Sequence, residues 1–123
     1  MNIEEYKKEL AGEKQNKYGN EWTMYNGVNY QSKKEADFAQ LLDTLKSAKN
    51  EADKVVSWES QIPYKFKVNG KIRTYRLDFR VWFANGVIRN YDVKGYKKGS
   101  AYDLFKLKKE LVEEQHGLVV EEV

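Results

Sequence analysis

The sequence predicts an α/β protein in which helices pack against one mixed β-sheet. Apolar and polar residues alternate between positions 75 and 83, which indicates a half-buried strand. Two other segments carry apolar residues at helical spacing, so the chain contains helices as well as strands. Three Asn-Gly pairs mark tight turns between neighbouring strands, at positions 26–27, 69–70 and 85–86. A length of 123 residues suits one hydrophobic core and is too short for two.

The first half of the chain predicts a helix, a hairpin and a second helix. Residues 2–11 show helical spacing of apolar side chains. Aromatic and β-branched residues on both sides of the first Asn-Gly pair predict a hairpin over residues 22–30. Ser32 and Glu35 form a capping box, because the hydroxyl suits the N-cap and the carboxylate follows three residues later. The helix that begins there is expected to run to about Lys49.

The second half predicts antiparallel strands, a helix and a closing strand. The expected strands cover residues 54–61, 64–68, 75–83 and 87–93, the helix covers 102–116, and the last strand covers 118–123. Pro63 lacks a backbone donor, so it marks either a break between the first two strands or an edge position. Gly117 suits the end of the helix. Because the odd-numbered residues of the 75–83 strand enter the core, Asp78 lies on the opposite face.

The composition excludes several classes of protein. The chain has no cysteine, which excludes disulfide scaffolds, thiolate zinc sites and cysteine nucleophiles, and its single histidine argues against a histidine-rich metal site. The longest apolar run has four residues, 81–84, which is too short to span a membrane. With 41% hydrophobic and 33% charged residues, the chain can bury a core and is not a disordered tail. From the absence of cysteine and of a membrane-spanning run we expect a soluble cytoplasmic protein. We expect an N-terminal helix and polar lead-in over residues 1–20 and a single domain over residues 21–123.

Positive charge is concentrated in the middle of the chain. Residues 64–108 hold 12 Lys or Arg and three acids, whereas the rest of the chain holds 10 basic and 16 acidic residues. A basic segment that also carries aromatic residues is typical of proteins that bind a phosphate backbone. The alternative is a solvated, lysine-rich surface without a specific partner.

Three charged residues are expected to meet near one hairpin. Asp92 and Lys94 are two positions apart and share a strand face, and Asp78 lies on the neighbouring strand. Mg²⁺ is bound in proteins by a few carboxylates together with water and phosphate oxygens. A lysine beside such a site can orient water or offset charge in the transition state. The cluster therefore suits metal-dependent phosphodiester hydrolysis; the alternatives are an exposed Asp78 and an ordinary surface ion pair between Asp92 and Lys94.

Glu35 is the third acid of this interpretation. Residues three, four and seven positions after it are Phe38, Ala39 and Leu42, so Glu35 begins the apolar face of its helix. An inward-facing carboxylate requires a partner, and a metal site would supply one. The alternative is that Glu35 only completes the capping box.

Three segments together resemble the PD-(D/E)XK nuclease superfamily. They are Ser32-Lys33-Lys34-Glu35-Ala36, Leu77-Asp78-Phe79 and Asp92-Val93-Lys94-Gly95. The sequence is most similar to small phage proteins of that group and to phage and bacterial Holliday-junction resolvases, and the likeness extends from about residue 17 to residue 123. Leu77 stands where the motif has proline, and Asp92 where glutamate is commoner.

The resemblance implies a restriction-endonuclease-like fold and a DNA endonuclease that uses Mg²⁺ or Mn²⁺. It assigns Asp78 as the central metal ligand, Asp92 and the backbone carbonyl of Val93 as further ligands, Lys94 as the catalytic lysine and Glu35 as the helix-borne acid. It also implies branched or recombination-intermediate DNA as substrate, a phage or mobile-element origin, and a homodimer, because resolvases cut two strands symmetrically. The alternatives are a catalytically inactive nucleic-acid-binding module and a protein-interaction factor with the same fold.

Further residues are assigned around this predicted site. Related nucleases often carry a glutamine or an acid near the position of Gln61, which is therefore expected to position water; a polar residue at the edge of the core is the alternative. Five basic side chains are expected to contact the nucleic acid backbone: Arg76, Arg80, Lys97, Lys98 and Lys106.

Overall fold

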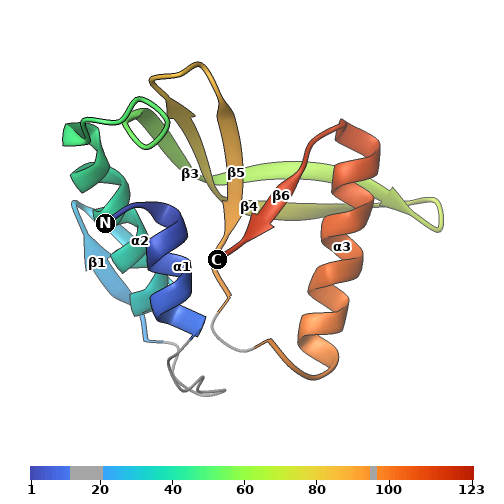
Figure 1. The fold of residues 1–123 in the computed structure, drawn as a ribbon. Coiled ribbons are helices and arrows are strands. Elements are labelled where there is room, and N and C mark those ends of the chain that lie inside the picture. Colours follow the sequence, from blue (N-terminus) through green and yellow to red (C-terminus); the bar gives the residue numbers. More distant parts are fainter. Residues whose placement is uncertain (12–20, 95–96) are drawn as a thin grey trace.

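The computed structural model describes residues 1–11, 21–94 and 97–123 (Figure 1). In chain order the elements are α1 (Ile3–Ala11), β1 (Thr23–Tyr25), β2 (Val28–Tyr30), α2 (Lys33–Thr44), a 3₁₀ turn (Leu45–Ser47), β3 (Val55–Val68), β4 (Lys71–Phe83), β5 (Ile88–Asp92), α3 (Ser100–His116) and β6 (Val120–Glu122). None of the helices in these ranges has the length and apolar character that a membrane span requires.

Strands β3 to β6 form one mixed sheet in the order β3-β4-β5-β6, and β1 and β2 form a separate two-stranded sheet. β3, β4 and β5 are antiparallel to one another, whereas β6 is parallel to β5. β3 and β4 form a long hairpin, and only the stretch of β4 from Phe79 to Trp82 also pairs with β5. The predicted α/β class with a mixed sheet and flanking helices is therefore confirmed.

Helices cover the two ends of the sheet separately. α1, α2 and the β1–β2 hairpin lie at one end, and α3 lies against the projecting part of the β3–β4 hairpin at the other (Figure 1). At the first end the Phe38 ring centroid lies 5.0 Å from that of Phe79 and 5.4 Å from that of Tyr91. A second cluster joins the hairpin to α3 and β6 through Phe66, Tyr75, Leu77, Val112 and Val120.

Local signals account for most element boundaries. Asn26 and Gly27 both have positive φ, as the predicted two-residue hairpin turn requires, and Gly117 ends α3 in the left-handed conformation. Two predictions were wrong. α2 ends at Thr44 and continues only as a 3₁₀ turn to Ser47, because Ala48 is extended with ψ 143°. The strands expected over 54–61 and 64–68 form one strand, β3. Of the two alternatives for Pro63, the edge position is confirmed and the break is wrong, because β3 lies at the edge of the described sheet.

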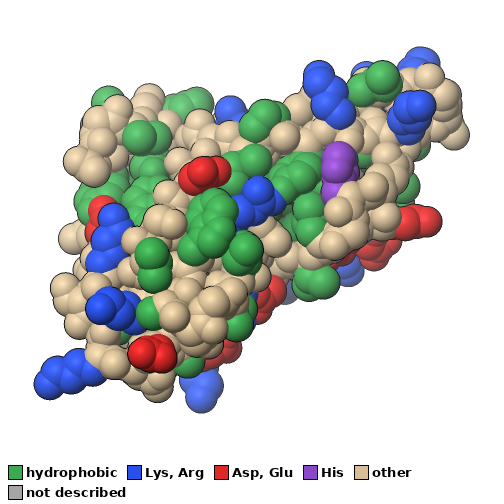
Figure 2. Space-filling view, turned by 90° about the horizontal axis from the view of Figure 1, so that it is seen from above, with side chains coloured by type: hydrophobic (Ala, Val, Ile, Leu, Met, Phe, Trp, Pro, Cys, Tyr) green, Lys and Arg blue, Asp and Glu red, His purple; other side chains and the backbone are tan. Residues whose placement is uncertain are grey.

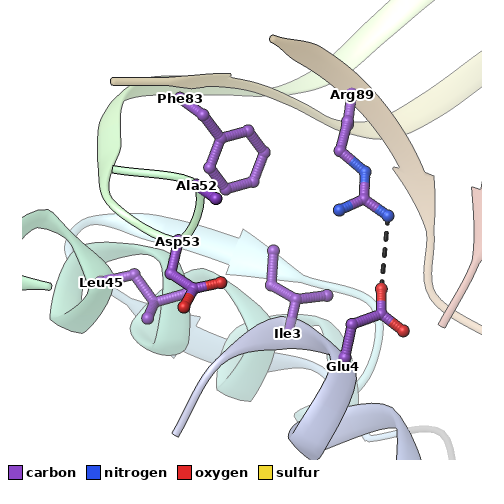
Figure 3. Close-up of a pocket in the computed structure, with 7 residues that line it drawn as sticks. All are labelled: Ile3, Glu4, Leu45, Ala52, Asp53, Phe83 and Arg89. Carbon is purple, nitrogen blue, oxygen red and sulfur yellow. Dashed lines mark hydrogen bonds and ion pairs between the residues drawn. The ribbon is translucent and has the colours of Figure 1, made fainter. Parts of the chain in front are cut away.

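The N-terminal helix belongs to the same core as the rest of the chain. Ile3 is buried, and the Tyr6 ring centroid lies 6.0 Å from that of Phe38. The Arg89 guanidinium donates to Glu4 at 3.3 Å (Figure 3). It also pairs with Glu121, so that Arg89 ties α1 to β5 and β6. The pocket beside this contact measures only about 20 Å³, which holds a single water at most. The predicted lead-in over residues 12–20 lies outside the described residues.

Candidate active site

Asp78 and Asp92 lie opposite each other where β4 and β5 separate. Phe79 and Tyr91 are the last paired residues, with Asp78 directly before the first and Asp92 directly after the second. The Asp78 N–H donates to Asp92 Oδ1 at 2.9 Å, and the Val93 N–H donates to Asp78 Oδ2 at 2.8 Å. The backbone of each strand therefore fixes a carboxylate of the other.

Both aspartates are held in an environment that disfavours their charged forms. Asp92 is 1% exposed, and its Oδ2 atom has no hydrogen-bond partner within the described part of the chain. Burial raises the pKa of Asp92 to about 6, against the opposing effects of the Asp78 N–H and of the Lys94 charge. Burial likewise raises the pKa of Asp78, although the Val93 N–H, Lys94 and Arg76 act in the other direction. A cation at this position would compensate both carboxylates.

Glu35 approaches this pair from the first turn of α2. The Ser32 hydroxyl accepts the Glu35 N–H at 3.1 Å, which confirms the N-cap. Burial and then the Asp78 charge raise the pKa of the Glu35 carboxyl to about 7, whereas Lys94, the Gln31 backbone and Arg76 lower it. The Glu35 side chain is half-buried and lies within range of the Asp78 and Lys94 charges. Its role beyond the capping of α2 stays a prediction.

Lys94 stands where three parts of the chain meet. Its N–H donates to the Val123 carbonyl at 3.2 Å, and its own carbonyl accepts from Lys34 Nζ at 2.8 Å. Its ammonium nitrogen lies 3.8 Å from the centroid of the Phe105 ring, a cation–π contact. Lys94 and Asp92 form none of the ion pairs seen in the described residues, and Asp92 is buried. The surface ion pair considered as an alternative is therefore wrong.

A pocket of about 240 Å³ opens beside Lys94, between β4 and the first half of α3. Its lining includes the cationic side chains of Arg76, Lys94 and Lys108, the hydroxyl of Thr74 and the ring of Phe105. Three cations around one open pocket favour an anionic group such as a phosphate.

Gln61, on β3, lies opposite Asp78, on the neighbouring strand β4. Ser60 pairs with Phe79 and Ile62 pairs with Leu77, which places Gln61 opposite Asp78 in the register. Its φ of 56° is in the left-handed region, which is uncommon for a residue with a Cβ atom. Gln61 is the only residue of β3 with a positive φ, and its predicted role in positioning water stays a prediction.

The five basic residues expected to contact nucleic acid occupy different surroundings. Arg76 is exposed and near enough to lower the pKa values of Glu35 and Asp78. Arg80 donates through Nε to Asn90 at 3.0 Å and lies 5.4 Å from the Tyr64 ring centroid. Lys97 is half-buried and Lys98 exposed, directly before α3; the loop residue Gly95 lies outside the described residues.

On α3, Lys108 and not Lys106 lies at the pocket beside Lys94, and the predicted contact of Lys106 with nucleic acid stays a prediction. Lys106 is exposed, with its ammonium 5.6 Å from the Tyr102 ring centroid, whereas Lys108 lines the pocket beside Lys94. The difference arises because α3 turns the Lys108 position toward β4, and the orientation of α3 about its axis was not evident from its apolar pattern.

Sequence reasoning did not find two charged neighbours of Asp92. Glu122 on β6 raises the pKa of Asp92, and Lys109 on α3 lowers it. Lys109 and Glu122 lie 3.9 Å apart, and the Tyr102 hydroxyl donates to Glu122 at 2.5 Å. Parallel pairing of β6 with β5 places Glu122 beside Asp92, and no local sequence signal announces that pairing.

The acids suit a site with few protein ligands. Among the described residues, no three acidic or histidine side chains lie close enough together to hold a metal ion by themselves. Mg²⁺ commonly keeps several waters and is bound by one or two carboxylates together with substrate phosphates. The facing aspartates, with one buried oxygen that lacks a donor, fit that kind of site.

Comparison with known proteins gives the family of this chain. Residues 15–120 match the family described as "Protein of unknown function (DUF1064)", so the chain belongs to that family. No curated protein and no solved structure matches the chain.

Proposed function

We propose that this DUF1064 protein is a metal-dependent DNA endonuclease with a restriction-endonuclease-like fold. The observation that carries the proposal is the pair of facing, backbone-fixed aspartates, Asp78 and Asp92, beside Lys94. Burying two carboxylates without enough hydrogen-bond donors destabilises a fold, so the arrangement calls for another explanation. The resemblance of the three sequence segments to PD-(D/E)XK nucleases supplies that explanation: Mg²⁺ or Mn²⁺ held by both acids.

In this proposal Asp78, Asp92 and the Val93 carbonyl hold the metal. When bound, it would act as a Lewis acid on the phosphate and lower the pKa of a coordinated water. The observed Val93 hydrogen bond uses its N–H and leaves the carbonyl oxygen out of that contact. Glu35 would complete the site from α2, either as a further ligand or through a water.

The other steps of the proposed reaction belong to side chains near the two aspartates and around the pocket beside Lys94. The Lys94 ammonium would orient the attacking water and offset the negative charge that develops on the phosphate. The Glu35 carboxyl, with a pKa of about 7, would be able to accept a proton from that water near neutral pH. Arg76 and Lys108 line the pocket with Lys94 and would bind the flanking phosphates.

One observation favours a second candidate, a nucleic-acid-binding module without cleavage. No three-acid group able to hold a metal occurs in the described part of the chain. A nucleic-acid-binding module would use the same basic surface, and it would not need Asp78, Asp92 and Glu35 to bind a metal ion together.

The deciding experiment is a cleavage assay with plasmid, single-stranded and branched DNA, in Mg²⁺, in Mn²⁺ and in EDTA. Asp78→Asn and Lys94→Met should each lower metal-dependent cleavage by roughly a hundredfold to a thousandfold. Asp103→Asn and Lys49→Met replace exposed residues of the same types and should cleave like the wild type. Binding without cleavage of any substrate would favour the binding module, and absence of DNA binding would favour a protein-interaction factor.

We also propose that the protein acts as a homodimer, by analogy with resolvases. The β1–β2 hairpin is the candidate contact, since Trp22 and Met24 are 64% and 65% exposed. Gel filtration with multi-angle light scattering should give twice the mass of the chain, and a Trp22→Ser, Met24→Ser variant should give the mass of a monomer.

A further inference from the structure

The β3–β4 hairpin continues well beyond the acids as a basic arm, defined here as residues 62–77. The arm carries five basic side chains and no acid: Lys65, Lys67, Lys71, Arg73 and Arg76. All five are exposed. Figure 2 shows Lys and Arg side chains gathered at the end of the molecule where this hairpin projects.

One face of the arm is open, and it leads toward Asp78. Lys65 pairs with Thr74 and Lys67 pairs with Ile72, and all four residues are exposed. The other face packs against α3; the Tyr75 and Phe105 rings, for example, are stacked with centroids 6.4 Å apart. Because side chains alternate along a strand, the open face of β4 also carries Arg76 and then Asp78.

α3 holds the arm in place. The Gln115 side chain accepts from the Lys67 N–H and donates to the Lys67 carbonyl, both at 2.8 Å. His116 Nε2 lies 2.5 Å from the Lys65 carbonyl oxygen. These contacts occupy the outer edge of β3 where it would otherwise be open to pairing. The lysines of the open face are thus presented on a fixed ribbon, which lowers the entropic cost of binding.

We propose that the open face of the arm binds the phosphate backbone of duplex DNA and guides it to the acids. This inference rests on the proposed function for the identity of the substrate. Lys67 pairs with Ile72, and Ile72 precedes Asp78 by six positions on β4, which corresponds to about 20 Å of strand and thus to about six base pairs along the DNA axis. The arm would therefore hold DNA at phosphates that the pocket beside Lys94 does not reach.

The chemistry of the surface favours DNA over an acidic protein. Protein interfaces are anchored by buried aromatic or aliphatic groups, whereas nucleic-acid interfaces are polar and strongly positive. The only large hydrophobic side chain among the exposed residues of the open face is Ile72.

The test is a binding measurement with a duplex of about two helical turns in EDTA, repeated over a range of salt concentrations. The variant combines Lys65→Gln with Lys67→Gln, and the matched control combines Lys8→Gln with Lys49→Gln, which are exposed lysines outside the arm. Each phosphate contact contributes about 0.9 to the slope of log K against log salt, so the arm variant should lower the slope by about 1.8. Thermal melting should show that both variants are folded.

Each result separates the arm from the proposed nuclease activity. If the arm variant keeps the affinity and the salt slope of the wild type, and the wild type cleaves DNA, the proposal that the arm binds DNA is overturned and the nuclease proposal stands. If the arm variant binds DNA more weakly but the wild type cleaves no substrate, DNA binding by the arm is supported and the proposed nuclease activity is overturned. Competition by polyglutamate as strong as that by duplex would indicate an acidic protein partner instead. A wild type that binds no duplex would overturn both.

Discussion

The two ends of β4 differ in nearly everything except their backbone conformation. From Phe79 to Trp82 the strand is central, because it pairs with β3 on one side and with β5 on the other. From Lys71 to Leu77 it pairs with β3 alone. Asp78 lies at the change. A carboxylate at that point can accept a backbone hydrogen bond from the residue that follows the departing strand, as Asp78 does from the Val93 N–H.

The packing of the two ends differs in the same way. The central end supports an aromatic cluster of Phe38, Phe79 and Tyr91, whose members are each at most 1% exposed. The projecting end is covered by α3 and carries exposed cations on its open face. From this difference we expect the central end to supply most of the stability, whereas the projecting end carries the surface that we propose to bind DNA.

The largest expected effect tests this division. Phe79→Ala should lower the free energy of unfolding by about 4 kcal/mol, because it removes the ring that joins α2 to the sheet. Leu77→Ala removes a buried side chain from the α3 cluster and should cost about 2–3 kcal/mol. Chemical denaturation measures both values.

Native-state hydrogen exchange then shows where each loss falls. Leu77→Ala should reduce amide protection mainly in α3 and the arm, whereas Phe79→Ala should reduce it throughout the described chain. Equal loss in every element for both variants would mean that the two ends unfold as one unit, and the comparison would fail.

The sequence predicted the central end of β4 and the placement of much of the candidate site because the signals are local. Alternation fixes which residues of β4 are buried, the capping box fixes where α2 begins, and the turns fix which strands are neighbours. Asp78, Asp92 and Glu35 follow from those three features. Glu122 and Phe105 could not be predicted in this way, and the pattern could not decide between Lys106 and Lys108. These positions depend on the parallel pairing of β6 and on how α3 is rotated against the arm.

The second prediction concerns pH, in protein kept free of metal with EDTA. Glu35 has a folded pKa of about 7 and an ordinary value of 4.5, so the folded state binds the additional proton between these values. Stability from this group is present at low pH and is lost as pH rises through about 7. The wild type should therefore lose on the order of 2 kcal/mol between about pH 5 and about pH 8, with Asp92 contributing in the same direction.

Glu35→Gln removes one of these two titrations. The variant should be more stable than the wild type at the upper end of this range, and its stability should change less with pH. Glu51→Gln, at an exposed position, is the control and should follow the wild type. Denaturation curves at several pH values measure the difference. If the Glu35→Gln curve runs parallel to that of the wild type, the Glu35 carboxyl is not in the environment described.

The smallest expected effect concerns the junction between the two ends, where the Phe105 ring holds the Lys94 ammonium. A cation–π contact contributes about 0.5–2 kcal/mol, so Phe105→Leu should slow cleavage between about twofold and thirtyfold, mainly through kcat. Phe105→Tyr keeps an aromatic face and should restore most of the rate. Because Phe105 also stacks on Tyr75 and Tyr102, a loss of stability alone cannot show whether the ring positions Lys94 or only packs against the two tyrosines.

The Lys94 ε-methylene protons provide the separate NMR readout. The ring current should shift them upfield in the wild type and in Phe105→Tyr but not in Phe105→Leu. An identical shift in all three proteins would show that the ring does not position Lys94.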